Sequence, residues 1–413
     1  MANAGFAPIT DNPVVNRNGD RYGFLPHLEV LAHAVEAARP LPLTVGVFGP
    51  WGSGKSSFMH MWRDLLGAQA HAVWVNPWKY DQKQEIWAAV ITSVLAEIQQ
   101  NERTRDKATR LARSLAWLSL RGVLSRGAPM VTGGLLGKEE AQQALDRLAD
   151  SDAEFHRHVN AFERDFAEAV DDYLDGADRL MVFIDDLDRC TPEAAVTVLE
   201  SLKLFTGDSR CVFVLAMDYD LLSAVAAKKF GELAPLKGAA YLEKIVQLPF
   251  FLPEVAWDTL RGSLAPYVLL PPQHAEPFWQ LTRTAFGASP RRLKRYVNVF
   301  NLAAAILERT SGGPAGNMRL LQLAELLILR SEHRSFYGHL ATDPGAWARL
   351  KDVAWGRSVP DAAIEAFYLD QPLMRLLSLG RDDQPAGFPV APDGEETERM
   401  MTTVRVTSGA PQV

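Results

Sequence analysis

A glycine-rich segment between an apolar run and a predicted helix restricts the fold more than any other feature. Residues 49–56 read Gly-Pro-Trp-Gly-Ser-Gly-Lys-Ser and directly follow the apolar run 43–48. This is the full G-x-x-x-x-G-K-[ST] pattern, in which glycines let the chain turn tightly and direct backbone N–H groups towards a phosphate. Lys55 is then expected to bind phosphate oxygens, and Ser56 to ligate Mg²⁺. The sequence therefore predicts a nucleotide site built on a strand, a loop and a helix.

Five short apolar runs alternate with segments of helical period. The runs are 43–48, 72–75, 180–184, 211–216 and 244–248. Continuous apolar runs are typical of strands that are buried on both faces. Their alternation with helices predicts an α/β fold with a mostly parallel five-stranded sheet covered by helices on both sides.

The 413 residues suffice for more than one domain, and a 47% hydrophobic content is that of a globular protein. The predicted parts are an N-terminal lead-in over 1–40, a core over 41–253, a helical lid over 254–345, a C-terminal helical segment over 346–380 and a disordered tail over 381–413. The stretch between the second and third strands far exceeds one crossover helix. We therefore expect a helical insertion at about 101–175 within the core.

Two carboxylates follow the third apolar run, at Asp185 and Asp186. In a site of this kind the first orients Mg²⁺ and the second polarises the attacking water, so we predict Asp185 as the metal ligand and Asp186 as the general base. The alternative is that Asp186 and Asp188 cap the helix that follows. Asn76, after the second run, is placed either to bind Mg²⁺-bound water or to hold the Asp185 loop, and Trp78 is expected to be a core aromatic.

The run Asp-Asp-Leu-Asp-Arg-Cys at 185–190 resembles the signature of the KAP family of P-loop NTPases, a mostly bacterial branch of the STAND ATPases. Five further blocks are similar to the family pattern: 20–24, 75–80, 213–220, 241–249 and 289–298. The phosphate loop also resembles the family's form, with Trp51-Gly52 inside it and Ser57 after it. The likeness spans about residues 11 to 331. The nucleotide contacts on this basis are Gly49, Pro50, Trp51, Gly52, Ser53, Gly54, Lys55, Ser56 and Ser57.

The resemblance implies ATP as the nucleotide, Mg²⁺ as its metal ion and a lid that closes over them. It places Asp218 at a sensor position after the fourth strand, and Arg291 or Arg292 where the lid meets nucleotide. We expect Arg291 to make that contact; the alternative is an ordinary helix start with solvent-facing arginines. Arg189 is either an arginine finger between subunits or a local partner of Asp185 or Asp188, and we favour the local pairing.

Residues 101–126 carry seven basic side chains: Arg103, Arg105, Lys107, Arg110, Arg113, Arg121 and Arg126. This stretch could contact nucleic acid or an anionic membrane surface, although a solvated helical face is the simpler interpretation. The net charge of −7 argues against a general nucleic-acid binder. No uncharged run reaches membrane length, no secretory signal is evident, and two cysteines in or beside apolar runs suit a reducing compartment. We expect a cytoplasmic protein, with peripheral membrane contact through 101–126 as an option and no transmembrane span.

These features together predict an ATPase that binds Mg-ATP, hydrolyses it slowly and acts as a conformational or assembly switch, with an unknown protein partner or with further copies of itself. The resemblance adds bacterial defence or signalling as a setting. Two alternatives stay open. One is a nucleotide-stabilised scaffold with little turnover, because Asp186 is shorter than the glutamate usual at that position. The other is a DNA-associated ATPase, which rests on 101–126 alone.

Overall fold

The computed structural model describes residues 7–408 apart from 68–69, 81–85, 126–151, 206–207, 221–222, 224–239, 241, 311–315 and 382–386. The chain divides into two compact units, Pro13–Pro253 and a second unit made of Met1–Asn12 with Glu254–Val413. Each unit is described by itself below. Within the described residues, no helix is both long and apolar enough to cross a membrane.

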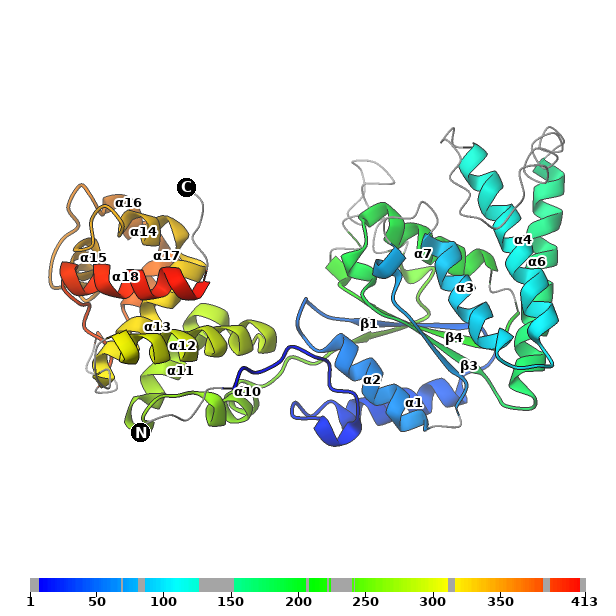
Figure 1. Cartoon of the computed structure of the whole chain (residues 1–413), viewed down its shortest axis with the longest axis horizontal. Helices are drawn as coiled ribbons and strands as arrows, with labels where there is room; N and C mark the ends of the chain where they lie inside the picture. The colour runs from blue at the N-terminus through cyan, green and yellow to red at the C-terminus, as the bar shows by residue number, and fades with distance from the viewer. Residues whose placement is uncertain are drawn as a thin grey trace. The chain divides into compact units, whose positions relative to one another are not determined.

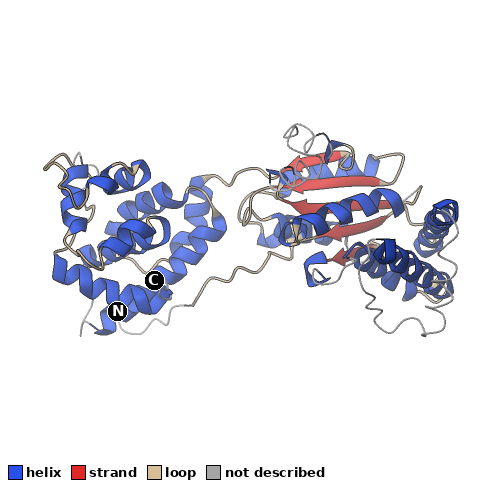
Figure 2. Cartoon of the chain, turned by 90° about the horizontal axis from the view of Figure 1, so that it is seen from above, coloured by secondary structure: helices blue, strands red, loops and turns tan. Residues whose placement is uncertain are grey.

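The unit 13–253 is built on a five-stranded, all-parallel sheet (Figure 2). Its strands are β1 (Leu43–Phe48), β2 (Ala72–Val75), β3 (Leu180–Ile184), β4 (Cys211–Met217) and β5 (Leu248–Phe251), in the order β2-β3-β4-β1-β5. The predicted α/β fold with a parallel five-stranded sheet is confirmed. β4 lies between β1 and β3, so the strands that carry the phosphate loop and the two carboxylates are one strand apart.

The fifth strand was predicted at 244–248, and its position is wrong by four residues. The observed β5 begins at Leu248 and contains Pro249, which pairs in register with Gly46. Proline has no backbone N–H to donate to a neighbouring strand. It is tolerated in β5 because β5 is an edge strand, with a partner on one side only. The more apolar Ile245 and Val246 are instead buried ahead of the strand, in the hydrophobic core cluster.

Helices cover both faces of the sheet (Figure 1). One face carries α1 (Leu25–Ala37) and α2 (Lys55–Leu66), and the other carries α3 (Ile86–Gln99) and α7 (Pro192–Phe205). The predicted insertion contains α4 (Arg105–Ser125) and α6 (Asp152–Leu174), which pack on each other, with α4 also against α3. Phe162, Phe166 and Val170 recur at steps of four and are buried in this packing. Arg126, the last residue of the predicted basic stretch, lies outside the described residues.

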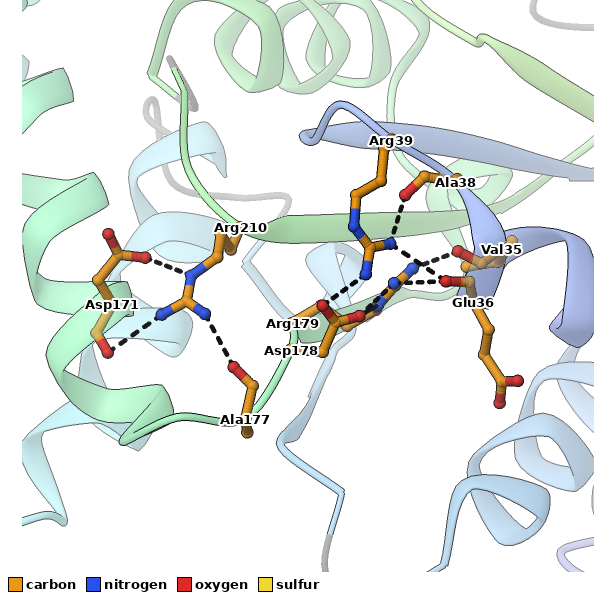
Figure 3. A network of polar contacts seen from close by, with 9 residues as sticks. All are labelled: Val35, Glu36, Ala38, Arg39, Asp171, Ala177, Asp178, Arg179 and Arg210. Carbon is orange, nitrogen blue, oxygen red and sulfur yellow. Dashed lines mark hydrogen bonds and ion pairs between the residues drawn. The ribbon is translucent and has the colours of Figure 1, made fainter.

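Arginines tie the elements together at the amino-terminal edge of the sheet (Figure 3). Arg179 donates to the carbonyl oxygens of Val35 and Glu36 in the last turn of α1 and pairs with Asp178, which Arg39 also contacts. Arg210, before β4, pairs with Asp171 of α6 at 2.6 Å. A guanidinium at a helix C-terminus satisfies carbonyls that lack helical partners and complements the helix dipole. The network therefore fixes α1 and α6 at the edge opposite the phosphate loop.

The unit 254–413 with 1–12 is helical throughout its described part. Its helices are α10 (Trp257–Leu264), α11 (Ala275–Phe286), α12 (Pro290–Thr310), α13 (Asn317–Glu332), α14 (Arg334–His339), α15 (Ala346–Ala354), α16 (Glu365–Tyr368), α17 (Gln371–Leu377) and α18 (Gly394–Ser408). The core runs along α13, where Leu321, Leu323 and Ile328 are fully buried. Within it, the ammonium of Lys351 lies 2.7 Å from a carboxylate oxygen of Glu325, which pairs two buried charges.

The disordered tail predicted over 381–413 is wrong for residues 394–408, which form α18. Met400, Met401 and Val404 are buried on one face of this helix, which packs against α12 and α13. Asp393 accepts from the backbone N–H of Glu396 and so caps the helix start. The tail was expected to be disordered because its acidic and proline residues dominate its composition, whereas three apolar residues at helical spacing suffice for docking.

Candidate functional site

The phosphate loop runs from the end of β1 to the start of α2, as expected from its sequence. Gly52 and Gly54 have positive φ angles of 85° and 109°, in the region that side chains disfavour. A Cβ atom on Gly54 would also lie 2.9 Å from the ring of Phe24. Phe24 is almost fully buried and precedes α1. The loop shape thus depends on both a glycine and an aromatic ring from the N-terminal lead-in.

The ammonium of Lys55 has three acceptors. It donates to the carbonyl oxygens of Gly49 and Pro50 at 2.9 and 3.3 Å, and it lies 3.1 Å from a carboxylate oxygen of Asp188. The side chains of Lys55 and Asp188 are only 8% and 11% exposed. A lysine that was predicted to bind phosphate is therefore held, largely out of water, by an ion pair with the third aspartate of the 185–190 run.

Ser56 and Asp185 meet as a site for Mg²⁺ requires. The hydroxyl of Ser56 donates to Oδ1 of Asp185 at 3.0 Å, and the backbone N–H of Asp186 donates to the same oxygen at 2.9 Å. Burial, with the neighbouring charge of Asp186, raises the pKa of Asp185 to about 6. A serine hydroxyl and a carboxylate are hard oxygen donors of the kind that Mg²⁺ prefers. These two residues fit the predicted metal ion.

Both carboxylate oxygens of Asp186 are in contact with a neighbouring side chain. The side-chain amide of Asn76 donates to Oδ2 at 2.8 Å, and Nε of Arg189 lies 2.7 Å from Oδ1. The backbone of Asp186 is left-handed, with φ 57°, a conformation that is uncommon for residues with a side chain although aspartate adopts it more readily than most. The next helix, α7, is instead capped by Thr191, whose hydroxyl accepts from the backbone N–H of Ala194 at 3.4 Å, and Asp188 pairs with Lys55. The alternative in which these aspartates cap the next helix is therefore wrong.

The neighbours of Asp186 differ in part from expectation. Arg189 makes the favoured local pairing, but its partner is Asp186 rather than Asp185 or Asp188. Its guanidinium lies over the ring of Trp78, 5.3 Å from the centroid. Trp78 is 50% exposed, so the prediction that it is a core aromatic is wrong. Asn76 holds the loop after β3, which was one of its two predicted roles.

Asp218 lies at the same edge of the sheet. It follows β4, whose last residue, Met217, accepts from the backbone N–H of Gly49 at 3.4 Å. The structure therefore brings Lys55, Ser56, Asp185, Asp186 and Asp218 to the carboxyl ends of β1, β3 and β4. Three buried atoms at this edge lack a hydrogen-bond partner within the described residues: Oγ of Ser53, Oδ1 of Asn76 and Nε of Arg189, the last of which is ion-paired with Asp186. Orphaned polar atoms beside a phosphate loop fit a polar ligand.

The two remaining predicted contacts are held by the N-terminal residues. The hydroxyl of Ser57 accepts from the backbone N–H of Val14 at 3.1 Å. Arg291 belongs to the unit 254–413, where its Nε lies 3.3 Å from the carboxylate of Asp11. Arg292, the less favoured candidate, pairs with Glu332. A contact between Arg291 and nucleotide stays a prediction.

The sequence interpretation missed two residues of the site. Asp188 was considered as a helix cap and as a partner of Arg189, but not as the partner of Lys55 that it is in the structure. Phe24 belongs to a block that was recognised for its resemblance but was given no role. In the structure its ring packs against Gly54 and against Phe58 of α2.

The chain matches a known protein family. Residues 25–307 match the KAP family P-loop domain. The chain is 23% identical over 295 residues to the phage T7 exclusion protein of Escherichia coli strain K12, a match that covers 63% of this chain and 36% of that protein's length. A solved structure, the Walker-type ATPase PABY2304 of Pyrococcus abyssi, is similar with a TM-score of 0.33 and 14% identity, over 95% of this chain and 98% of the other. Since the domain match takes in more than half of its residues, the chain belongs to the KAP family of P-loop NTPases.

Proposed function

We propose that the chain binds Mg-ATP at residues 49–57 and hydrolyses it slowly, as a conformational or assembly switch. The observation that carries the proposal is the hydrogen bond between Ser56 and Asp185, because it joins the start of α2 to the end of β3 with the two side chains that suit Mg²⁺. Lys55 stands one residue before Ser56, at the start of the helix whose N–H groups and dipole favour phosphate.

Each residue has a separate part in this proposal. The loop backbone and Lys55 bind the phosphates, and Ser56 with Asp185 holds the metal ion. When bound, Mg²⁺ neutralises phosphate charge and orients the phosphate oxygens. Asp186 orients the attacking water and accepts its proton. Asp218 senses the state of the phosphates, and Arg291 contacts the phosphates from the helical lid. Positioning and charge neutralisation carry such a reaction, so no covalent catalyst is needed.

Slow turnover is proposed because Asp186 is held. Its two carboxylate oxygens already bind Asn76 and Arg189, so a water must compete with an amide and a guanidinium for the same acceptor. The same observation favours the alternative function, a scaffold that binds nucleotide and barely hydrolyses it. A DNA-associated ATPase has less support, since Arg103 and Lys107 of the basic stretch pair with Asp175 and Asp172.

The relative's name supplies a biological setting for the proposal. A phage T7 exclusion protein acts in exclusion of a phage, and this chain matches 36% of that protein's length. We propose a role in bacterial defence on this basis, with a protein partner or further copies of the chain as the target of the switch.

The test is Mg-ATP turnover and binding by the wild type, Lys55→Ala and Asp186→Asn, with each sample sized with and without nucleotide. A hydrolysing switch is expected to lose binding in Lys55→Ala, to lose turnover but keep binding in Asp186→Asn, and to change size or shape with nucleotide. Tight binding without turnover in the wild type would support the scaffold. Absence of nucleotide binding in the wild type would refute both.

A further inference from the structure

All three donors of the Lys55 ammonium are in use. An ammonium has three N–H groups, and those of Lys55 face the carbonyl oxygens of Gly49 and Pro50 and the carboxylate of Asp188. A phosphate that binds Lys55 must therefore take the place of at least one of these acceptors. Asp188 is the acceptor that carries a negative charge.

We propose that Asp188 is a built-in competitor of nucleotide phosphate for Lys55, and that phosphate binding displaces it. The inference rests on the proposed nucleotide binding at residues 49–57. A phosphate beside Lys55 would bring like charges together in a place where both partner side chains are about nine-tenths buried and water screens little. The carboxylate and the phosphate therefore exclude each other, while either one alone satisfies the ammonium.

Displacement of Asp188 would also affect Asp186, the predicted base. Asp188 is the middle residue of the short 3₁₀ turn η3 (Leu187–Arg189). The last residue of this turn, Arg189, pairs with Asp186. The turn is closed by two backbone bonds, from the N–H of Arg189 to the carbonyl of Asp186 at 3.1 Å and from the N–H of Cys190 to the carbonyl of Leu187 at 3.3 Å, and Leu187 is its buried anchor. When Asp188 leaves Lys55, Arg189 moves with it and loosens its hold on Asp186. Phosphate binding at Lys55 would thus open one carboxylate oxygen of Asp186, while Asn76 still binds the other.

The opposite role for Asp188 makes an opposite prediction. If its carboxylate served to aim Lys55 at the phosphate, removal of the charge would weaken nucleotide binding. If it competes, Asp188→Asn tightens binding, because the buried ammonium then lacks a charged partner until phosphate arrives. Mutually exclusive binding events of this kind typically change affinity by about tenfold.

The first test is calorimetric titration of wild type, Asp188→Asn and a control, Asp171→Asn, with Mg-ADP and with Mg-ATP. The variant Asp171→Asn also loses an ion pair with an arginine, Arg210, but this pair lies at the opposite edge of the sheet. We expect Asp188→Asn to bind both nucleotides about tenfold more tightly, and Asp171→Asn to match the wild type. Equal or weaker binding in Asp188→Asn, beside a wild type that binds, would overturn the inference and leave the proposed function standing. Absence of binding in all three proteins would remove both.

A second measurement needs no variant, in case Asp188→Asn does not fold. Hydrogen–deuterium exchange of the wild type is followed in the peptide that covers residues 186–199, with and without Mg-ADP. We expect faster exchange at the amides of Arg189 and Cys190 when nucleotide is bound, because η3 is released from Lys55. Unchanged or slower exchange there, together with protection of the loop 49–57, would show that nucleotide binds without displacing Asp188.

Discussion

The side-chain amide of Asn76 donates to Asp186 across 2.8 Å and so joins the ends of two neighbouring strands. Asn76 follows β2, and Asp186 follows Asp185 at the end of β3. Arg189 contacts the other carboxylate oxygen of Asp186. The left-handed backbone of Asp186 sets the direction in which its side chain projects. The proposed base therefore has a defined position before any ligand is considered, and its two partners limit its access to water.

Asn76→Ala is expected to raise basal turnover about fivefold, which corresponds to the loss of one hydrogen bond of about 1 kcal/mol. One oxygen of Asp186 would then be open to the attacking water, while Lys55 and Ser56 still bind nucleotide. Steady-state turnover and nucleotide titration check the two parts separately. A drop in turnover as severe as that of Asp186→Asn would instead mean that Asn76 places the base for the reaction.

Binding of Mg²⁺ is expected to weaken as the pH falls through about 6. Burial and the charge of Asp186 raise the pKa of Asp185 to about 6, and a protonated carboxyl cannot ligate the ion. The measurement is nucleotide affinity with and without Mg²⁺ between pH 5 and about 8. The same titration of Asp185→Asn gives the pH dependence of the triphosphate itself. A Mg²⁺ effect in the wild type that is constant across this range would contradict the assignment of Asp185.

The same pKa predicts how stability depends on pH without Mg²⁺. Because the folded-state pKa lies above the ordinary value of 3.8, the folded protein holds this proton more tightly than the unfolded chain. The resulting stabilisation is complete below about pH 3.8 and is lost as the pH rises through about 6. Asp185→Asn is therefore expected to be more stable than the wild type at about pH 8, by about 3 kcal/mol, with a smaller difference at about pH 5. Denaturant unfolding at both pH values checks this.

The sheet and the phosphate loop could be predicted from sequence because their signals are local. Each buried strand is a continuous apolar run, and the loop motif fixes Gly49, Lys55 and Ser56 at set spacings. The fifth strand was misplaced because Pro249 reads as a strand breaker until the edge position of β5 is known. Similarly, the burial of Met400 and Met401 in α18 depends on contacts with α12 and α13, which are far away in the sequence.

The ion pairs of the site are a different case. That Asp188 reaches Lys55, and that Arg189 reaches Asp186, depends on the direction of the turn η3, which residue types alone do not determine. The exposure of Trp78 has the same origin. An aromatic residue after a buried strand is usually part of the core, but here its face is covered by the guanidinium of Arg189. Sequence therefore identified the residues of the site better than it identified their partners.

Gly54→Ala is expected to destabilise the protein more than Gly67→Ala does. Both glycines flank α2 and have positive φ angles, of 109° and 83°, but a Cβ on Gly54 meets Phe24 at 2.9 Å, whereas a Cβ on Gly67 meets nothing within 4 Å. Backbone strain of about 1 kcal/mol is common to both variants, and the clash adds about 1 to 2 kcal/mol in Gly54→Ala alone. Thermal unfolding gives the comparison. Equal losses would show that Phe24 gives way easily.

Arg179→Ala is expected to lower the free energy of unfolding by about 2 kcal/mol, because it removes a buried guanidinium that donates to the carbonyls of Val35 and Glu36 at the end of α1 and pairs with Asp178. Arg39→Ala is the matched control. Arg39 bonds to the same helix end and to Asp178, but it is half exposed, so its removal is expected to change stability by less than about 1 kcal/mol. Denaturant unfolding of both variants checks the difference, and similar losses would mean that burial of Arg179 adds nothing.

Residues 7–12 are bound to α12 of their own unit. Ile9 exchanges two hydrogen bonds of 2.8 Å with the side chain of Asn298 on α12, and Asp11 pairs with Arg291 and Arg295. After Asn12 the chain enters the other unit, where Val14 donates to Ser57 of α2. Residues 7–12 are thus bound to α12, which carries Arg291, and Val14 is bound to α2, which follows the phosphate loop.

Asp11→Asn is expected to loosen residues 7–12 from α12. Burial alone would raise the pKa of Asp11, but hydrogen bonds and charge from Arg295 and Arg291 outweigh it and lower the pKa, so the carboxylate is charged and paired at neutral pH. Hydrogen–deuterium exchange in the peptide 7–12 is expected to become several-fold faster, since the amide of Ile9 is protected only while this segment stays docked. Glu332→Gln is the control. It removes the partner of Arg292, which lies on α12 as Arg291 does, and it leaves Asp11 unchanged. Unchanged exchange in Asp11→Asn would show that Asn298 holds the segment by itself, and the variant Asn298→Ala would then be expected to release it.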